Sequence, residues 1–94
     1  MDQSELLQWV RDNSSGMNLD SKELQHVAMH CHHLYRWYHE GYPLGGFLTA
    51  VTRNDFVGAC LNADAVNIKA LRIYALFLMW HLPADWRKKA KGGG

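Results

Sequence analysis

Arg36, Trp37 and Tyr38 stand side by side just before a glycine-rich turn, and their chemistry stands out in the chain. A guanidinium holds a phosphate through paired hydrogen bonds, and an aromatic ring stacks on a flat base. Trp37 falls outside the apolar stripe of its predicted helix, so we expect it to be exposed. The trio predicts a site for a phosphorylated aromatic ligand. The alternative is the edge of a hydrophobic core that carries a surface arginine.

Gly45 and Gly46 follow the turn and open the next predicted helix. Free N–H groups at a helix start bind anions. Two adjacent glycines are also what a tight turn requires, and that alternative stays open. Polar side chains follow shortly after, and we expect the ligand to contact Arg36, Trp37, Tyr38, Gly45, Gly46, Arg53 and Asn54. The two arginines would hold phosphate, an aromatic ring would stack, and the remaining groups would offer hydrogen bonds.

His26, His30 and His33 recur at helical spacing on the polar side of the helix before that turn. Neighbouring helical imidazoles converge and can bind zinc or nickel. No carboxylate is paired with them in an obvious way, and a solvated polar face is the alternative. We predict that this histidine row binds no metal. Because protonation would crowd positive charge on one side, we expect it to respond to mild acid.

The sequence contains no recognisable reaction centre. Serines occur only near the start of the chain, in cap and loop settings. Cys31 lies on the core stripe of its helix, where a nucleophile would be inaccessible. We therefore predict that the protein is not an enzyme, has no catalytic residues and uses no cofactor. Cys31 and Cys60 are interpreted as buried, reduced, structural thiols.

The periodicity of apolar residues predicts helices throughout. We expect a helix over residues 4–11 capped by Ser4, and a long helix between an Asp20–Glu23 capping box and Gly41. Shorter helices should cover residues 47–52 and the stretch after Asn54 or Asp55. Asp64 should cap a last long helix over residues 65–82, which Pro83 ends.

The last predicted helix is apolar over most of its circumference. Its core stripe is expected to comprise Ile68, Leu71, Ala75, Leu78, Met79 and Leu82. Four further apolar residues, Ile73, Leu76, Phe77 and Trp80, widen the stripe. A small chain has few elements to surround such a helix, so we expect a subunit interface here.

Length and composition fit one small domain. The chain has 94 residues, 48% of them hydrophobic, and a formal net charge of +1. We predict an all-α fold, a small bundle of four to five helices over residues 1–91 assembled as a homo-oligomer, and a disordered glycine tail over residues 92–94. The near-neutral charge argues against general nucleic-acid binding. The N-terminus has no secretory pattern and no stretch suits a bilayer, so we expect a cytoplasmic protein with no membrane partner.

The segment from Tyr38 to Asn67 carries a Gly-x-Pro turn, the run GGFLTAV, an Asn-Asp pair and an Ala-Asp pair with Asn three residues on. In this respect the chain resembles small accessory proteins of tailed bacteriophages and prophages. The resemblance covers about a third of the chain. It implies a phage-encoded, non-structural accessory protein in the host cytoplasm, and implies no particular activity.

Phage accessory proteins often interfere with the host, and some act as oligomeric sponges that trap a nucleotide signal of bacterial immunity. By analogy, we expect host-defence evasion through non-catalytic binding of a nucleotide-derived small molecule. Two alternatives stay open. One is an inhibitor that docks exposed aromatic residues onto a host protein. The other is a regulator of phage DNA metabolism that touches nucleic acid through the basic tail after Pro83.

Overall fold

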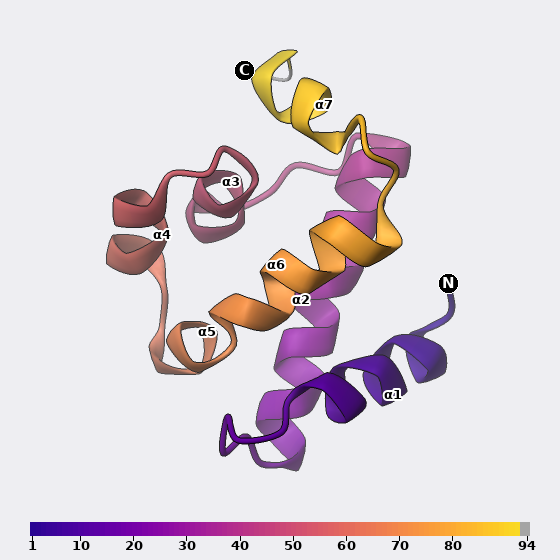
Figure 1. The fold of residues 1–94 in the computed structure, drawn as a ribbon, viewed down its shortest axis with the longest axis vertical. Helices are drawn as coiled ribbons and strands as arrows, with labels where there is room; N and C mark the ends of the chain where they lie inside the picture. Colours follow the sequence, from indigo (N-terminus) through magenta and orange to yellow (C-terminus); the bar gives the residue numbers. More distant parts are fainter. Residues whose placement is uncertain (93–94) are drawn as a thin grey trace.

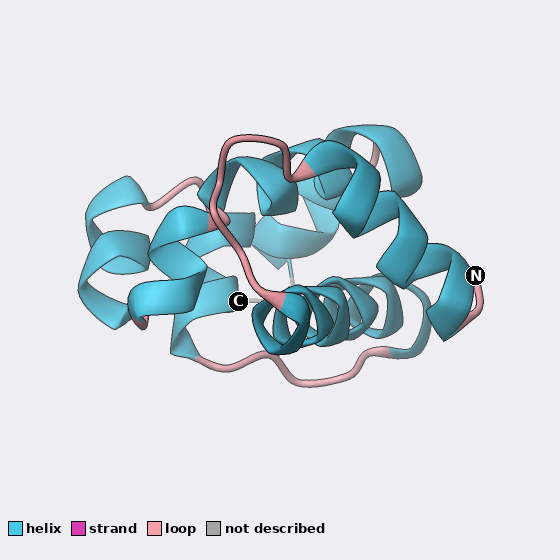
Figure 2. Cartoon of the chain, turned by 90° about the horizontal axis from the view of Figure 1, so that it is seen from below, coloured by secondary structure: helices cyan, strands magenta, loops and turns pink. Residues whose placement is uncertain are grey.

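The computed structural model describes residues 1–92, and this part of the chain contains helices and loops but no strand (Figures 1 and 2). The helices are α1 (Gln3–Asn13), α2 (Ser21–Glu40), α3 (Gly46–Thr52), α4 (Phe56–Asn62), α5 (Ala65–Lys69), α6 (Leu71–His81) and α7 (Trp86–Gly92). The predicted all-α class is confirmed. The sequence predicted four to five helices, whereas the described residues form seven. Of the predicted disordered tail, Gly92 ends α7 and residues 93–94 lie outside the described part.

Helix α2 is the long central element, and its local signals act as predicted. Asp20 accepts a hydrogen bond from the Glu23 N–H, and the Glu23 carboxylate accepts one from the Asp20 N–H, which completes the capping box. Gly41 ends the helix with φ at 71°, a left-handed conformation that glycine adopts without strain. The predicted stripe is buried from Leu24 to Leu34.

Helix α1 packs across one end of α2, and α6 crosses α2 nearer its middle (Figure 1). The N-cap of α1 is Asp2, whose carboxylate accepts from the Glu5 N–H at 2.8 Å, and not Ser4 as predicted. Leu6 and Val10 supply the buried face of α1. Residues of α1, α2 and α6 thus form part of the core, to which α3 adds Phe47, Leu48 and Ala50.

The predicted last long helix is two helices, because the chain breaks at Ala70. This fully buried residue has φ −101° and ψ 10°, outside the helical region, and its N–H ends α5 by bonding back to Asn67 and Val66. The expected core stripe is confirmed at Leu78 and Leu82, which are buried, and Leu71 packs against the core. It is wrong at its other three residues, because the break redirects α6: Ala75 is exposed, and Ile68 and Met79 are 46% and 60% exposed.

The face of α6 that enters the core consists of Ile73, Tyr74, Phe77 and Leu78. Ile73 and Phe77, which were expected to serve a subunit interface, have no exposed surface within the single chain. Those two side chains stabilise this chain's own core. Trp80, at 74% exposed, is the residue of that predicted group that remains open to a partner.

Helices α3, α4 and α5 form an arm beside the α2–α6 crossing (Figure 1). Asp55 caps α4 and Asp64 caps α5, as the sequence indicated. Helix α4 packs on α3 mainly through Ala59, its one buried residue. Phe56, Val57 and Leu61 are 72%, 63% and 80% exposed, so the apolar side of α4 faces outward.

Helix α7 was expected as an irregular basic tail and is instead a short helix that packs on α3. Trp86 and Ala90, one turn apart, are its buried side chains. The Tyr38 hydroxyl donates a hydrogen bond to Asp85, just before α7, and so ties this end of the chain to α2. Within residues 1–92, no helix combines the length and apolar character needed to cross a bilayer.

Candidate functional site

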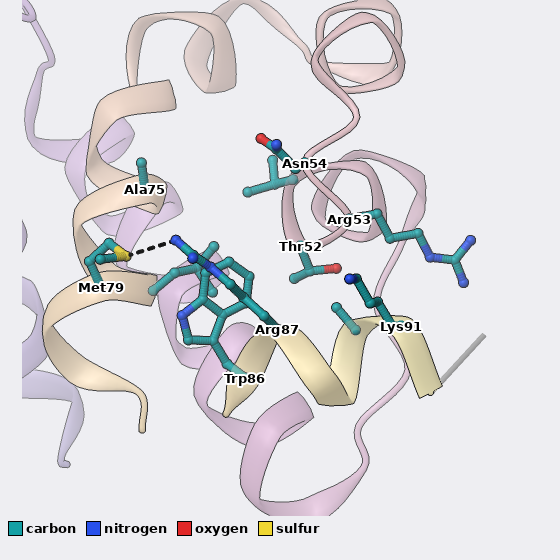
Figure 3. Close-up of a pocket in the computed structure, with 11 residues that line it drawn as sticks. Thr52, Arg53, Asn54, Ala75, Met79, Trp86, Arg87 and Lys91 are labelled. Atoms are coloured by element: carbon teal, nitrogen blue, oxygen red, sulfur yellow. Dashed lines mark hydrogen bonds between the residues drawn. The ribbon is translucent and has the colours of Figure 1, made fainter. Parts of the chain in front are cut away.

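A cavity lies between the end of α3, one side of α6 and helix α7, and we call it the α7 pocket. Its volume is about 820 Å³. Its lining residues are Val51, Thr52, Arg53, Asn54, Ala75, Leu78, Met79, Trp86, Arg87, Ala90 and Lys91. Figure 3 shows how the three elements surround it. Two of the residues predicted to contact a ligand, Arg53 and Asn54, are therefore placed at a cavity.

Three cations line the α7 pocket, and no carboxylate does. Arg87 reaches across toward Met79 on α6, and the Lys91 side chain points toward Thr52 (Figure 3). Arg53 extends outward at the rim. The ion pairs found among residues 1–92 all lie elsewhere in the molecule, so these cations have no acidic partner there. Such a pocket attracts anions.

Apolar side chains also line the α7 pocket. Trp86 and Leu78 are buried at its base, and Met79 is open to solvent. The Arg87 guanidinium lies 5.2 Å from the centroid of the Trp86 ring, and its Nη2 approaches Met79 Sδ at 3.6 Å. These weak contacts hold Arg87 over the pocket and leave its remaining N–H groups free for a stronger acceptor.

A smaller cavity of about 420 Å³ adjoins the Gly41–Leu44 turn, and we call it the turn pocket. Its lining includes Trp37, Tyr42, Thr49, Arg53 and Lys89. Arg53 also lines the α7 pocket, so a single guanidinium lies at the edge of both cavities. Trp37 was expected to be exposed; it is half-buried and packs against the core at the edge of this cavity.

Arg36 and Tyr38 line neither cavity, because both have partners within the chain. Arg36 Nε donates to Glu40 Oε1 at 3.1 Å, and its guanidinium lies 4.4 Å from the Tyr42 ring centroid. The Tyr38 hydroxyl bonds to Asp85, which raises its pKa. The structure thus brings the predicted residues together only in part.

Gly45 and Gly46 stand at the opposite end of α3 from Arg53 and Asn54. A Cβ atom at Gly46 would lie 3.3 Å from Asn62 Oδ1, so the missing side chain allows α4 to approach α3 closely. Nothing lies within 4 Å of a Cβ at Gly45. Because α3 has only seven residues, its start offers a weak dipole for an anion. These observations favour the turn and packing interpretation of the pair.

The residues that sequence reasoning missed are those on α7, above all Trp86, Arg87 and Lys91. A signal for them existed, because Trp86 is followed by four basic residues with Ala90 at helical spacing. Interpreting this stretch as a tail hid its amphipathic character. No three His, Cys, Asp or Glu side chains in residues 1–92 are grouped so that they could hold a metal ion.

A scan against protein-family models and searches of curated proteins and of solved structures found no match for this chain. The structure itself therefore defines the class of the protein. It is a small helical protein with a cationic, partly apolar pocket beside helix α7.

Proposed function

We propose that the protein binds a phosphorylated aromatic small molecule, a nucleotide-type signal, in the α7 pocket. The observation that carries the proposal is the composition of this pocket. Arg53, Arg87 and Lys91 line it together with apolar side chains such as Met79 and Trp86, and the lining contains no carboxylate. A phosphate and a flat ring in one molecule need these two kinds of surface.

The size of the α7 pocket supports a ligand of this kind. At about 820 Å³ it falls in the range of cavities that hold drug-sized ligands and cofactors. Arg87 would hold phosphate by paired hydrogen bonds, and Lys91 would add a point charge. Met79 would contact the ring, because its exposed, flexible thioether adapts to flat surfaces. Arg53 would close the rim.

The chemistry of the lining supports binding without catalysis. It contains no His, Cys, Asp, Glu or Ser, so a nucleophile paired with a general base is missing from the pocket. Its one hydroxyl, that of Thr52, donates to the Thr49 carbonyl oxygen at 2.9 Å. A protein that only binds would act by sequestration.

The biological side of the proposal comes from the resemblance to phage accessory proteins. A phage protein that sequesters a nucleotide signal in the host cytoplasm would evade host defence without an enzyme's turnover. Because one ligand is held per site, such a protein must be abundant or multivalent, and assembly as a homo-oligomer supplies several sites.

Thermal-shift measurements with cyclic dinucleotides, ADP-ribose derivatives and NAD test the proposal, with inorganic phosphate alone as a reference probe. A ligand at roughly a hundred times its Kd stabilises the folded protein by about 2.7 kcal/mol. Calorimetry then compares Arg87→Ala and Lys91→Ala with the parent. Loss of a charge-assisted hydrogen bond costs about 1.5–3 kcal/mol, an expected weakening of roughly 10- to 150-fold.

Arg72→Ala and Lys22→Ala are the matched controls, because both residues are exposed and line neither cavity. They remove the same charges and should bind like the parent. If no nucleotide in the panel binds, or if the control variants lose as much affinity as the pocket variants, the α7 pocket is not the site.

A second candidate function, inhibition of a host protein, is favoured by a different surface. The outward side of α4 presents Phe56, Val57 and Leu61, each more than half exposed. Apolar clusters of this kind mark protein interaction sites. Leu61→Glu should abolish binding to a host protein while leaving nucleotide binding unchanged, which separates the two candidates.

A further inference from the structure

Helix α5 is held in the fold by polar contacts as well as by apolar packing. Its one buried residue is Asn67, at 4% exposed, whereas Ile68 is 46% exposed and Val66 is a partly buried residue packed against the core. Because so short a helix buries few apolar side chains, hydrogen bonds and charge contribute to its attachment to α2 and α6. An element anchored in this way responds to the protonation of its partners.

The polar contacts run from α5 to both neighbouring helices. Asp64, the N-cap of α5, places Oδ2 3.4 Å from Nε2 of His26 on α2. On the other side, the buried Tyr74 hydroxyl of α6 donates to Asn67 Oδ1 at 2.6 Å, and His30 Nδ1 lies 3.5 Å from the same hydroxyl oxygen. Two histidines of α2 thus face α5 and its partner on α6.

The rings of the histidine row lie in contact with one another. The centroids of His26 and His30 are 4.4 Å apart, and those of His30 and His33 are 5.9 Å apart. His33 lies against Tyr42, whose ring also receives the Arg36 guanidinium. Positive charge therefore borders the row at its His33 end.

We propose that His26, His30 and Asp64 form an acid-sensitive latch, which holds α5 against α2 and α6 at neutral pH and releases it when a proton binds His30. No residue of this latch lines the α7 pocket, so the inference stands apart from the proposed function.

The groups around His30 explain why a proton on this ring weakens the latch. Asp64, the acidic group that faces the row from α5, lies against His26 and not against His30. A proton on His30 is placed between the rings of His26 and His33, 4.4 Å and 5.9 Å away. Tyr74, which faces His30 from α6, stays neutral because burial raises its pKa. Glu23 is paired with Lys69 at 3.5 Å, at the other end of α5.

The directions of two histidine pKa shifts support this account. Burial, then His26 and His33, lower the pKa of His30, and Asp64 opposes them; burial, His32 and Arg36 lower the pKa of His33. The folded state therefore favours neutral rings at His30 and His33. A released row would take up protons near the ordinary value of 6.5, so the attachment of α5 is complete above that pH and weakens as the pH falls below it.

Amide hydrogen exchange measured by NMR tests the latch. The Ile68 and Ala70 N–H groups bond to the Asp64 and Val66 carbonyl oxygens at 3.1 Å and report on α5. Their protection factors should fall roughly tenfold or more between about pH 7.4 and about pH 5, while those of α1 change less. Equal behaviour of the two helices would overturn the proposal.

Variants test whether the acid-induced loss of protection in α5 arises from the histidine row. His30→Gln keeps a polar group near Tyr74 and cannot take up a proton, so the acid-induced loss of protection should disappear. Asp64→Asn keeps an N-cap and removes the counter-charge, so release should move to higher pH. His39→Gln is the control, because His39 is an exposed histidine of the same helix outside the row; it should behave like the parent.

Direct titration of the His30 ring in the parent protein covers the case in which His30→Gln does not fold. Its pKa should lie below 6.5 and fall further in Asp64→Asn. A His30 pKa at or above 6.5, or one that Asp64→Asn leaves unchanged, would show that the two residues are not coupled as proposed.

Discussion

The hydroxyl of Tyr74 donates a 2.6 Å hydrogen bond to Asn67 Oδ1, and this bond joins α6 to α5 across a site closed to solvent. Tyr74→Phe would leave the buried Asn67 oxygen without its partner. We expect the free energy of unfolding to fall by about 1–3 kcal/mol, measured by urea denaturation. Tyr35→Phe is the control, because the half-buried Tyr35 hydroxyl makes no hydrogen bond within residues 1–92. Equal losses in the two variants would count against the bond.

The two cysteines should differ in reactivity. Cys31 has no exposed surface, and burial raises the pKa of its thiol, which suppresses the reactive thiolate. Cys60 was expected to be buried as well; it is only half-buried, on the arm. A thiol reagent should therefore modify Cys60 quickly in the native protein and Cys31 only on unfolding, as mass spectrometry of the digested protein would show. Equal native rates would contradict this burial.

Acid should destabilise the fold through His81 as well as through the histidine row. The His81 ring packs against Trp9 and Phe77, its Nε2 has neither solvent contact nor a hydrogen-bond partner, and burial lowers its pKa. The unfolded chain therefore binds the proton more readily, so stability present above about pH 6.5 is lost as the pH falls below it.

His81→Phe removes this titration and keeps an aromatic ring in the same place. The difference between urea midpoints at about pH 7.5 and about pH 5 should be smaller in His81→Phe than in the parent. His39→Gln, which alters an exposed histidine, should leave the difference as it is. A parent protein equally stable at both pH values would refute this account.

Self-association should depend on Trp80 and not on Phe77. Trp80 is 74% exposed, so Trp80→Glu should lower the assembly state and leave the helical circular dichroism spectrum intact. Phe77 is fully buried in the single chain, so Phe77→Ala should cost about 3–5 kcal/mol of stability whatever the assembly state. Light scattering should first establish the assembly state of the parent protein. If the parent is a monomer at all concentrations, the prediction has no basis.

The features that the sequence alone determined are local ones. The Asp20–Glu23 capping box, the left-handed Gly41, and the Asp55 and Asp64 caps all follow from side chains that bond to backbone groups a few residues away. The stripe on α2 was equally predictable, because burial repeats with the helical period from Leu24 to Leu34 within one element.

The tertiary structure decided the rest. The break at Ala70 has no glycine or proline to announce it, and it changes which face of α6 enters the core. The α7 pocket unites the end of α3 with α6 and α7, which lie far from α3 in the chain. Of its lining, Arg53 and Asn54 were predicted from sequence as ligand contacts, whereas Trp86, Arg87 and Lys91 were not. The contact of His26 with Asp64 likewise spans α2 and α5. Capping needs only neighbours in sequence, whereas a pocket or a latch exists only once packing has placed separate helices side by side.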